Sequence, residues 1–400
     1  MKEKLYQEID SVRQSIDQLS RDIRSNPELA FEEHKAAAFM IALLSAHGFD
    51  IEFPVGGVDT AFKATFNGKS GGPTVAFMAE YDALPEMGHA CGHNLIAMAS
   101  AGAGIGLSKL MGELPGKIVI LGTPAEEVGG GKIVMIKGGA FDGIDFALMA
   151  HPSRINRIGG QSLAISDVTI EFFGRPAHSS APEKGINALS AVLHTFYLVD
   201  AMRTNMPTRT NINGIINSGG VASNIIPEYA KCTFAVRAAT LHDLKKVIDR
   251  IKTAIRCAET ATGARAVVDI ESPYSESYEN STMAEMYKKY MDAMGETVGY
   301  PAPSDKFGSS DTANVQIKLP AIQPAVQVCD PSLAGHTLEF RDACVTDHAH
   351  EAMGKAAKAM AATALDILTD EALRNTILDE FNRVVPKYTD EDTNIAPYKS

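Results

Sequence analysis

The 400-residue sequence lacks the features of a membrane-spanning or nucleic-acid-binding protein. No uninterrupted apolar run reaches the roughly 18 residues that a membrane-spanning helix needs. Residues 1–8 are charged and contain no apolar signal core. The formal net charge is −12 and no basic stretch stands out, which argues against nucleic acid or an anionic membrane surface as a partner. We therefore expect a cytoplasmic protein.

A disulfide framework and a phosphate-binding loop are also missing. The five cysteines are odd in number and scattered, so disulfide pairing is not expected. The glycines before Lys132 resemble a phosphate loop, but Glu126 stands where that motif requires its first glycine, so we expect a tight turn into a helix. Hydrophobic residues make up 45% of the chain, which is long enough for a large core and two domains.

The stretch Gly88-His89-Ala90-Cys91-Gly92-His93-Asn94 places two imidazoles and a thiol within five residues. It follows an apolar run at 74–79 and precedes a helical pattern that begins near Leu95. A thiolate and an imidazole two residues apart suit zinc or a similar transition metal. Taken alone, the stretch is also compatible with a redox or structural cysteine beside a surface histidine.

Three further apolar runs are followed by residue types that bind metals. They are residues 117–122 before Glu126 and Glu127, 146–150 before His151, and 325–328 before His336. Short apolar runs between helical patterns are typical of buried parallel strands. Ligands of such sheets bind beyond the carboxyl ends of the strands. We therefore expect the Cys/His, Glu/Glu, His and His groups to meet at one edge of the sheet.

The pattern of the chain changes near residue 163. Before it, helices are expected at 5–24 and 32–47, followed by alternating strands and helices. After it, a period-two alternation predicts antiparallel strands with two helices. The fold class is therefore α/β, with a mixed, mainly parallel sheet flanked by helices and an inserted α+β domain. The expected parts are a first domain made of residues 1–162 and 282–400 and an inserted domain at 163–281.

Several motifs carry a family resemblance that runs from Asn26 to about Gly354. The chain resembles the aminoacylase and carboxypeptidase-G group of cocatalytic metallohydrolases (peptidase family M20), which has a zinc-exopeptidase-like catalytic domain. It looks most like the amidohydrolase branch with indole-acetyl-amino-acid hydrolases, p-aminobenzoyl-glutamate hydrolase and a β-alanyl-lysine type dipeptidase. The motifs are Tyr-Asp-Ala-Leu-Pro at 81–85, His-Ala-Cys-Gly-His at 89–93, Pro-Ala-Glu-Glu at 124–127, Gly-Arg-Pro-Ala-His-Ser at 174–179, Ala-Ser-Asn-Ile-Ile-Pro at 222–227 and Gly-Ser-Ser-Asp at 308–311.

The resemblance implies a site for two divalent transition-metal ions per chain, namely zinc, manganese, cobalt or nickel. Cys91 would bridge the two ions, and the other ligands would be His93, Glu127, His151 and His336. A water between two such ions has a lowered pKa and becomes a hydroxide nucleophile, while the ions polarise the amide carbonyl. By the same resemblance, Glu126 is the general base that later protonates the leaving amine.

Other residues are expected to support this site. Asp82 would hold the second nitrogen of a ligand histidine, whereas His89 is interpreted as structural or supporting. The resemblance implies that His178, in the inserted domain, stabilises the tetrahedral oxyanion, often from the partner subunit. It also implies that Asn224 and Arg237 bind substrate, Arg237 through a terminal carboxylate. Ordinary surface roles for His178 and Arg237 stay open.

The sequence thus predicts an amidohydrolase that cleaves N-acyl amino acids or small dipeptides. The resemblance implies that residues 1–162 and 282–400 form the catalytic domain, that the insert at 163–281 is a lid and dimerisation domain, and that the protein is a homodimer or higher homo-oligomer. Asn94 replaces an aspartate found in many relatives, and the Gly-Ser-Ser-Asp motif replaces Gly-Ser-Glu-Asp, which favours the dipeptidase and aminobenzoyl-glutamate side of the branch. One alternative is a cysteine-nucleophile amidase that uses Cys91 and survives chelation. The other alternative is a non-catalytic, metal-dependent binding protein on the same fold.

Overall fold

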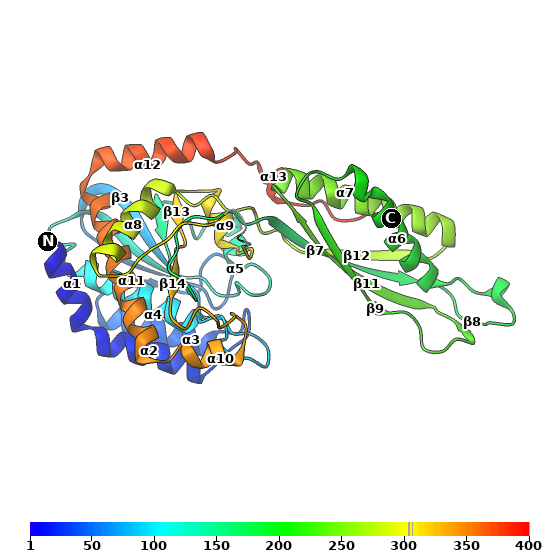
Figure 1. Ribbon diagram of the computed structural model, residues 1–400, viewed down its shortest axis with the longest axis horizontal. Helices are drawn as coiled ribbons and strands as arrows, with labels where there is room; N and C mark the ends of the chain where they lie inside the picture. The colour runs from blue at the N-terminus through cyan, green and yellow to red at the C-terminus, as the bar shows by residue number, and fades with distance from the viewer. Residues whose placement is uncertain (303–304, 306, 400) are drawn as a thin grey trace. The chain divides into compact units, whose positions relative to one another are not determined.

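The computed structural model describes residues 1–302, 305 and 307–399 (Figure 1). The chain forms two compact units. The first unit contains Met1–Gln161 and Ser277–Pro386, and the second contains Ser162–Glu276 and Lys387–Ser400. The last residues therefore group with the inserted unit, whereas the sequence assigned all of 282–400 to the catalytic domain.

The first unit is built on a six-stranded sheet in the order β1-β2-β4-β3-β5-β13. Its strands are β1 Asp50–Glu52, β2 Phe62–Asn67, β3 Lys69–Ala79, β4 Pro115–Gly122, β5 Phe146–Leu148 and β13 Ala321–Ile322. β3, β4, β5 and β13 pair in parallel, and β1 and β2 add an antiparallel edge. The predicted mixed, mainly parallel sheet is confirmed.

Helices flank this sheet, and one of them is buried along its whole length. They are α1 Lys2–Ser11, α2 Arg13–Ser25, α3 His34–Ala46, α4 His93–Ser108, α5 Gly131–Lys137, α8 Ser281–Ala293, α9 Thr312–Gln316, α10 Leu338–Ala343, α11 Asp347–Thr369 and α12 Glu371–Val384. Every residue of α4 is buried. Added Cβ atoms at Gly104 and Gly106 would lie 2.4 Å from Ile120 and 2.3 Å from Ile9. Small residues therefore let α4 fit tightly between the sheet and α1, which holds the start of α4 in a fixed place.

Two sequence expectations about the first unit were wrong in detail. The single helix expected at 5–24 is two helices that meet at Val12. His151 begins a short strand of its own, β6 His151–Ser153, which pairs in parallel with β14 Ala325–Gln327 outside the main sheet. His336 lies in the loop after β14. In the part of the chain that is described, no helix is long and apolar enough to cross a membrane.

The second unit contains a four-stranded antiparallel sheet in the order β12-β7-β11-β9. Its elements are β7 Ala164–Phe173, β8 Ala177–His178, α6 Ala188–Met202, β9 Asn211–Ser218, β10 Ile225–Ile226, β11 Tyr229–Ala238, α7 Leu241–Thr262, β12 Arg265–Ile270 and α13 Asp390–Thr393. Buried residues alternate strictly along β7 and β11, because α6 and α7 cover one face of the sheet (Figure 1). Lys252 Nζ donates to the Ala396 carbonyl at 2.6 Å, which fixes the tail on α7. The predicted antiparallel sheet with two helices is confirmed.

Candidate metal centre

The first unit brings together the five residues that the sequence proposed as metal ligands. The donor atoms of Cys91, His93 and His151 lie within 4.8 Å of one another, and so do those of Cys91, Glu127 and His336. Cys91 Sγ is 3.6 Å from His151 Nε2, and Glu127 Oε1 is 3.5 Å from His336 Nε2. Because Cys91 belongs to both groups, the arrangement suits a thiolate shared by two ions.

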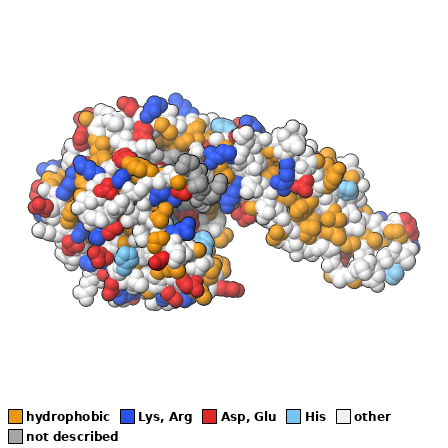
Figure 2. Space-filling model, viewed as in Figure 1, with side chains coloured by type: hydrophobic (Ala, Val, Ile, Leu, Met, Phe, Trp, Pro, Cys, Tyr) orange, Lys and Arg blue, Asp and Glu red, His pale blue; other side chains and the backbone are white. Residues whose placement is uncertain are grey.

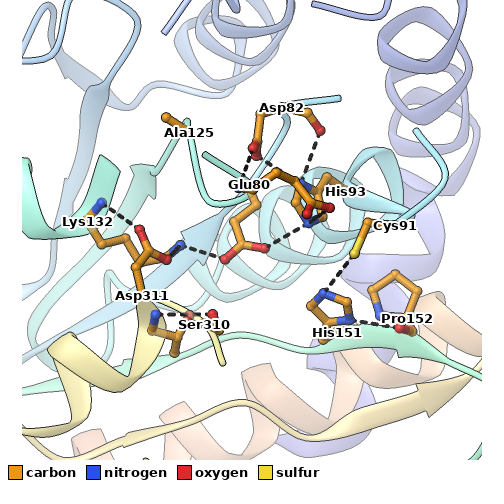
Figure 3. A network of polar contacts seen from close by, with 12 residues as sticks. Glu80, Asp82, Cys91, His93, Ala125, Lys132, His151, Pro152, Ser310 and Asp311 are labelled. Atoms are coloured by element: carbon orange, nitrogen blue, oxygen red, sulfur yellow. Dashed lines mark hydrogen bonds and ion pairs between the residues drawn. The ribbon is translucent and has the colours of Figure 1, made fainter. Parts of the chain in front are cut away.

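The turn that presents Cys91 depends on Gly92. This glycine has φ 82° and precedes α4, whose first residue is His93. An added Cβ would lie 2.8 Å from Pro152 Cγ and 3.0 Å from Cys344 Sγ. Glycine therefore allows both the left-handed backbone and the close approach of the turn to β6. Figure 3 shows Cys91 and His151 facing each other across this contact.

Replacing Gly92 by alanine is expected to lower the free energy of unfolding by about 1–3 kcal/mol, because the added methyl group meets a strained backbone and packed neighbours. The bound metal per chain should fall as well, since the turn carries Cys91. Denaturant unfolding and elemental analysis of the purified variant measure both effects. Gly112→Ala is the matched control because no atom lies within 4 Å of its added Cβ. Wild-type stability and metal content in the Gly92 variant would contradict the prediction.

Asp82 forms hydrogen bonds with two of the ligand candidates, His93 and Glu127. Its Oδ1 is 2.8 Å from His93 Nδ1, and its Oδ2 accepts a hydrogen bond from the Glu127 backbone N–H at 2.9 Å. Burial alone would raise the pKa of Asp82, but the His93 charge and hydrogen bond lower it below its ordinary value. With Nδ1 facing Asp82, His93 presents Nε2 to the cluster.

A second observation indicates that these side chains fit a metal site. His93 Nε2 and Glu127 Oε1 are buried and have no hydrogen-bond partner in the described part of the chain. These two atoms lie 3.8 Å apart. Buried polar atoms are ordinarily satisfied, so a pair of unsatisfied donor atoms facing each other indicates space for an ion between them.

Glu126, next to the ligand candidate Glu127, has the environment of a proton-transfer group. Burial raises its pKa well above the ordinary value, and the negative charges of Glu80 and Asp311 raise it further. A carboxyl group with a raised pKa can both accept and return a proton near neutral pH. The preceding residue, Ala125, has a left-handed φ of 61°, which turns the chain after β4. Carboxylate oxygens of Glu126 and Glu127 and a ring nitrogen of His93 lie within 4.8 Å of one another.

The environment of Cys91 does not favour a free thiolate nucleophile. Burial raises the pKa of its thiol, and His93 opposes this rise only in part. Reactive cysteines need a lowered pKa. The cysteine-nucleophile alternative is therefore not supported by this geometry.

Sequence analysis missed a buried ionic network beside the site. Lys132 Nζ lies 2.5 Å from Glu80 Oε1 and 2.7 Å from Asp311 Oδ1, and all three side chains are fully buried (Figure 3). Glu80 Oε2 in turn is 3.4 Å from His93 Nε2. The position of Glu80 directly after the apolar run 74–79 was an available signal. Lys132 was interpreted only as part of a turn.

Glu33 is a second supporting residue that the sequence did not reveal. Its Oε1 accepts from the Ala125 backbone N–H at 2.8 Å, and its Oε2 accepts from Thr60 Oγ1 at 2.8 Å. Burial raises the pKa of Glu33 to about 7, although the hydrogen bond from Thr60 opposes the shift. Glu33 therefore holds the turn that precedes Glu126 in place through these hydrogen bonds.

Glu33→Gln is expected to flatten the pH dependence of stability between the ordinary carboxyl value of 4.5 and about 7. The folded chain holds the Glu33 carboxyl proton more tightly than the unfolded chain does. The stabilisation that this proton provides is therefore complete below pH 4.5 and is lost as pH rises through about 7. The loss amounts to about 3 kcal/mol at most. Urea unfolding at about pH 5 and about pH 8 should show a smaller difference for the variant than for the wild type. Parallel pH profiles would contradict the prediction.

The remaining candidate residues belong to none of the groups of possible metal ligands. His89 is buried, burial lowers its pKa to about 4, and it belongs to none of the ligand groups. His178, Asn224 and Arg237 are in the second unit. β8 pairs with β10, and the Ser179 N–H donates to the Asn224 carbonyl at 2.9 Å, so the His178 and Asn224 segments are neighbours. Arg237 lies on β11, on the face away from α6 and α7.

Known proteins similar to this chain indicate its family. A family model described as a peptidase dimerisation domain matches residues 164–259. The chain is 36% identical to the Xaa-Arg dipeptidase of Mus musculus over 95% of its own length and 92% of that protein. It is 25% identical to one of the subunits of p-aminobenzoyl-glutamate hydrolase from Escherichia coli K12, over 97% of both chains.

Solved structures show the same fold. A Bacillus subtilis protein described as a dinuclear metal-binding peptidase of the M20 family matches 90% of this chain and 99% of its own, with a TM-score of 0.66 and 19% identity. An aminohydrolase structure from methicillin-resistant Staphylococcus aureus matches 92% of this chain and 100% of its own, with a TM-score of 0.76 and 20% identity. The sequence identity with the Xaa-Arg dipeptidase extends over nearly the full length of both chains. The chain therefore belongs to the M20 family of metal-dependent peptidases and amidohydrolases.

Proposed function

We propose that this enzyme is a two-metal hydrolase that cleaves the amide bond of N-acyl amino acids or small dipeptides. The observation that carries the proposal is the position of Cys91 in both groups of ligand atoms. The relatives named as an Xaa-Arg dipeptidase and a p-aminobenzoyl-glutamate hydrolase support a short substrate. Their names also support an amino acid as the group released.

In this proposal, Cys91 is the shared ligand, and His93, Glu127, His151 and His336 complete the two coordination sets. When bound, two divalent ions supply Lewis acidity and lower the pKa of a water molecule. Zinc, manganese, cobalt and nickel are all compatible with a thiolate, imidazole and carboxylate set.

The protein's own groups move the protons and hold the substrate. Glu126 takes a proton from the attacking water and delivers it to the amine as the carbon–nitrogen bond breaks, so the proton count balances. Asp82 keeps His93 in position. From the second unit, His178 would donate to the developing oxyanion, and Asn224 and Arg237 would bind the substrate, Arg237 through its carboxylate.

We also propose a homodimer formed through the second unit. β9 is an edge strand of its sheet. Figure 2 shows hydrophobic side chains gathered over β9 and β11, and Ile215 on β9 is 58% exposed. An exposed apolar edge strand is suited to pairing with a second copy. Sedimentation equilibrium measures the subunit number. The cytoplasmic location expected from the sequence stays a prediction.

Metal content and chelation test the proposed function. Purified protein is analysed for bound metal and assayed on N-acyl amino acids and dipeptides before and after chelation. We expect about two ions per chain, loss of activity on chelation, and recovery with zinc, manganese, cobalt or nickel. Activity that survives complete metal removal would contradict the mechanism and support a Cys91 nucleophile.

A further inference from the structure

His336 differs from the other two histidine ligand candidates in how it is held. His93 is fully buried, begins α4, and has its Nδ1 2.8 Å from Asp82 Oδ1. His151 lies on β6, which pairs with β14, and its Nδ1 is 2.7 Å from the Pro152 carbonyl oxygen. His336 lies in a loop, has a left-handed φ of 59°, and has a side chain that is 52% exposed. The position of the His336 imidazole therefore depends on what holds its loop.

The segment from His336 to Cys344 contacts the turn that carries Cys91 at both of its ends. The His336 backbone N–H donates to the Ala90 carbonyl at 3.0 Å. At the other end, Cys344 packs against Gly92, because a Cβ added to this glycine would lie 3.0 Å from Cys344 Sγ. The segment and the turn are far apart in sequence. The position of His336 relative to Cys91 therefore depends on contacts between them.

Asn94 supplies a side-chain link between the same two segments. Its Nδ2 donates to the Cys344 carbonyl at 3.2 Å and to Ser20 Oγ at 2.8 Å, and all three residues are fully buried. Cys344 is the C-cap of α10, so its carbonyl is one that the helix itself leaves without a partner. Ser20 Oγ in turn is 3.0 Å from His350 Nε2. Because a carbonyl oxygen can only accept hydrogen bonds, the link to Cys344 requires the amide donor of Asn94.

We propose that Asn94 is a positioning residue of the candidate metal centre. Its amide holds the His336 segment against the turn, which keeps the donor atoms of Cys91, Glu127 and His336 within reach of one ion. The inference rests on the proposed two-metal site. The other group of donor atoms contains no residue of the His336 segment. Loss of the Asn94 amide should therefore affect the two ions unequally.

Calorimetric titration of the metal-free protein with Zn²⁺ tests the inference. The wild type should show two binding events. Asn94→Leu removes the amide donor at nearly constant side-chain volume. In this variant one event should weaken by about 10–100-fold, the range expected when a group that orients a ligand is lost, while the other changes less than about threefold. Asn94→Ala, which favours the helical backbone of α4, should give the same pattern if leucine prevents folding.

Asn280→Leu is the matched control. Asn280 is also buried, and its Nδ2 donates to the Ile377 carbonyl at 3.1 Å. Its Oδ1 accepts from the Met283 N–H at 3.1 Å, so this substitution should lower the urea midpoint of unfolding at least as much as Asn94→Leu does. Because Asn280 lies outside both ligand-bearing segments, the control should keep both Zn²⁺ binding events. The comparison separates a positioning role from a general loss of stability.

Hydrogen exchange of peptides that span residues 336–344 gives a readout that needs no bound metal. In the metal-free Asn94 variants these amides should exchange about tenfold faster than in the wild type, and in Asn280→Leu they should exchange at the wild-type rate.

Two Zn²⁺ binding events of wild-type affinity in the Asn94 variants would overturn the inference. An equal weakening of both events would also overturn it, because Asn94 would then act on the whole centre. If the wild type binds fewer than two ions, the proposed function fails. The exchange of residues 336–344 then still decides whether Asn94 holds the segment, and an unchanged rate in the Asn94 variants would show that it does not.

Discussion

Glu126→Gln is expected to lower kcat by about 10³-fold while the metal content stays at the wild-type level. Glutamine keeps the size and the burial of the side chain but can neither accept the proton of the attacking water nor return it to the leaving amine. Steady-state kinetics on an N-acyl amino acid and elemental analysis of the same preparation measure the two effects. The loss should appear in kcat more than in KM, because Glu126 acts on the reacting atoms.

The adjacent glutamate provides the matched comparison. Glu127 Oε1 lies 3.8 Å from His93 Nε2 and 3.5 Å from His336 Nε2, so Glu127→Gln should reduce both activity and bound metal. The two variants carry the same substitution, glutamate to glutamine, at adjacent positions. If Glu126→Gln lost metal as Glu127→Gln does, the division between base and ligand would be wrong.

Lys132→Met is expected to lower the free energy of unfolding by about 3–5 kcal/mol, because it leaves two buried carboxylates without their shared cation. Lys132 Nζ contacts Glu80 and Asp311 at 2.5 and 2.7 Å, and none of the three side chains is exposed. Burial already raises the pKa of Asp311 to about 6 despite the ion pair. Activity should fall as well, since Glu80 also approaches His93. Urea unfolding measures the change in stability.

Lys137→Met is the control for this substitution because Lys137 is an exposed lysine on the same helix, α5. It should unfold like the wild type. The deficit of Lys132→Met should shrink as pH falls, because the unpaired carboxyls can then be neutralised by protons. A deficit below about 1 kcal/mol at neutral pH, the range of surface ion pairs, would show that the network contributes little to stability.

The sequence by itself determined the fold class and the types of residue at the candidate metal centre. Apolar runs and period-two alternation report on burial, which is a local property of each strand, and they predicted both the mainly parallel sheet and the antiparallel insert. The ligand candidates could be found because each follows an apolar run or lies in a short motif such as His-Ala-Cys-Gly-His. Family resemblance then separated the role of Glu126 from that of Glu127.

Apart from Asp82, which the sequence predicted, only the tertiary structure decided which side chains lie around the candidate centre. Lys132 pairs with Asp311 across 179 residues of sequence, and Glu33 holds the Ala125 backbone across 92 residues. Neither pairing leaves a periodic signal, because a buried ionic contact depends on where two distant segments meet. The separate β6–β14 pair was hidden for the same reason. Local patterns fix what each segment buries, whereas the packing of segments far apart in the chain fixes what each buried charge faces.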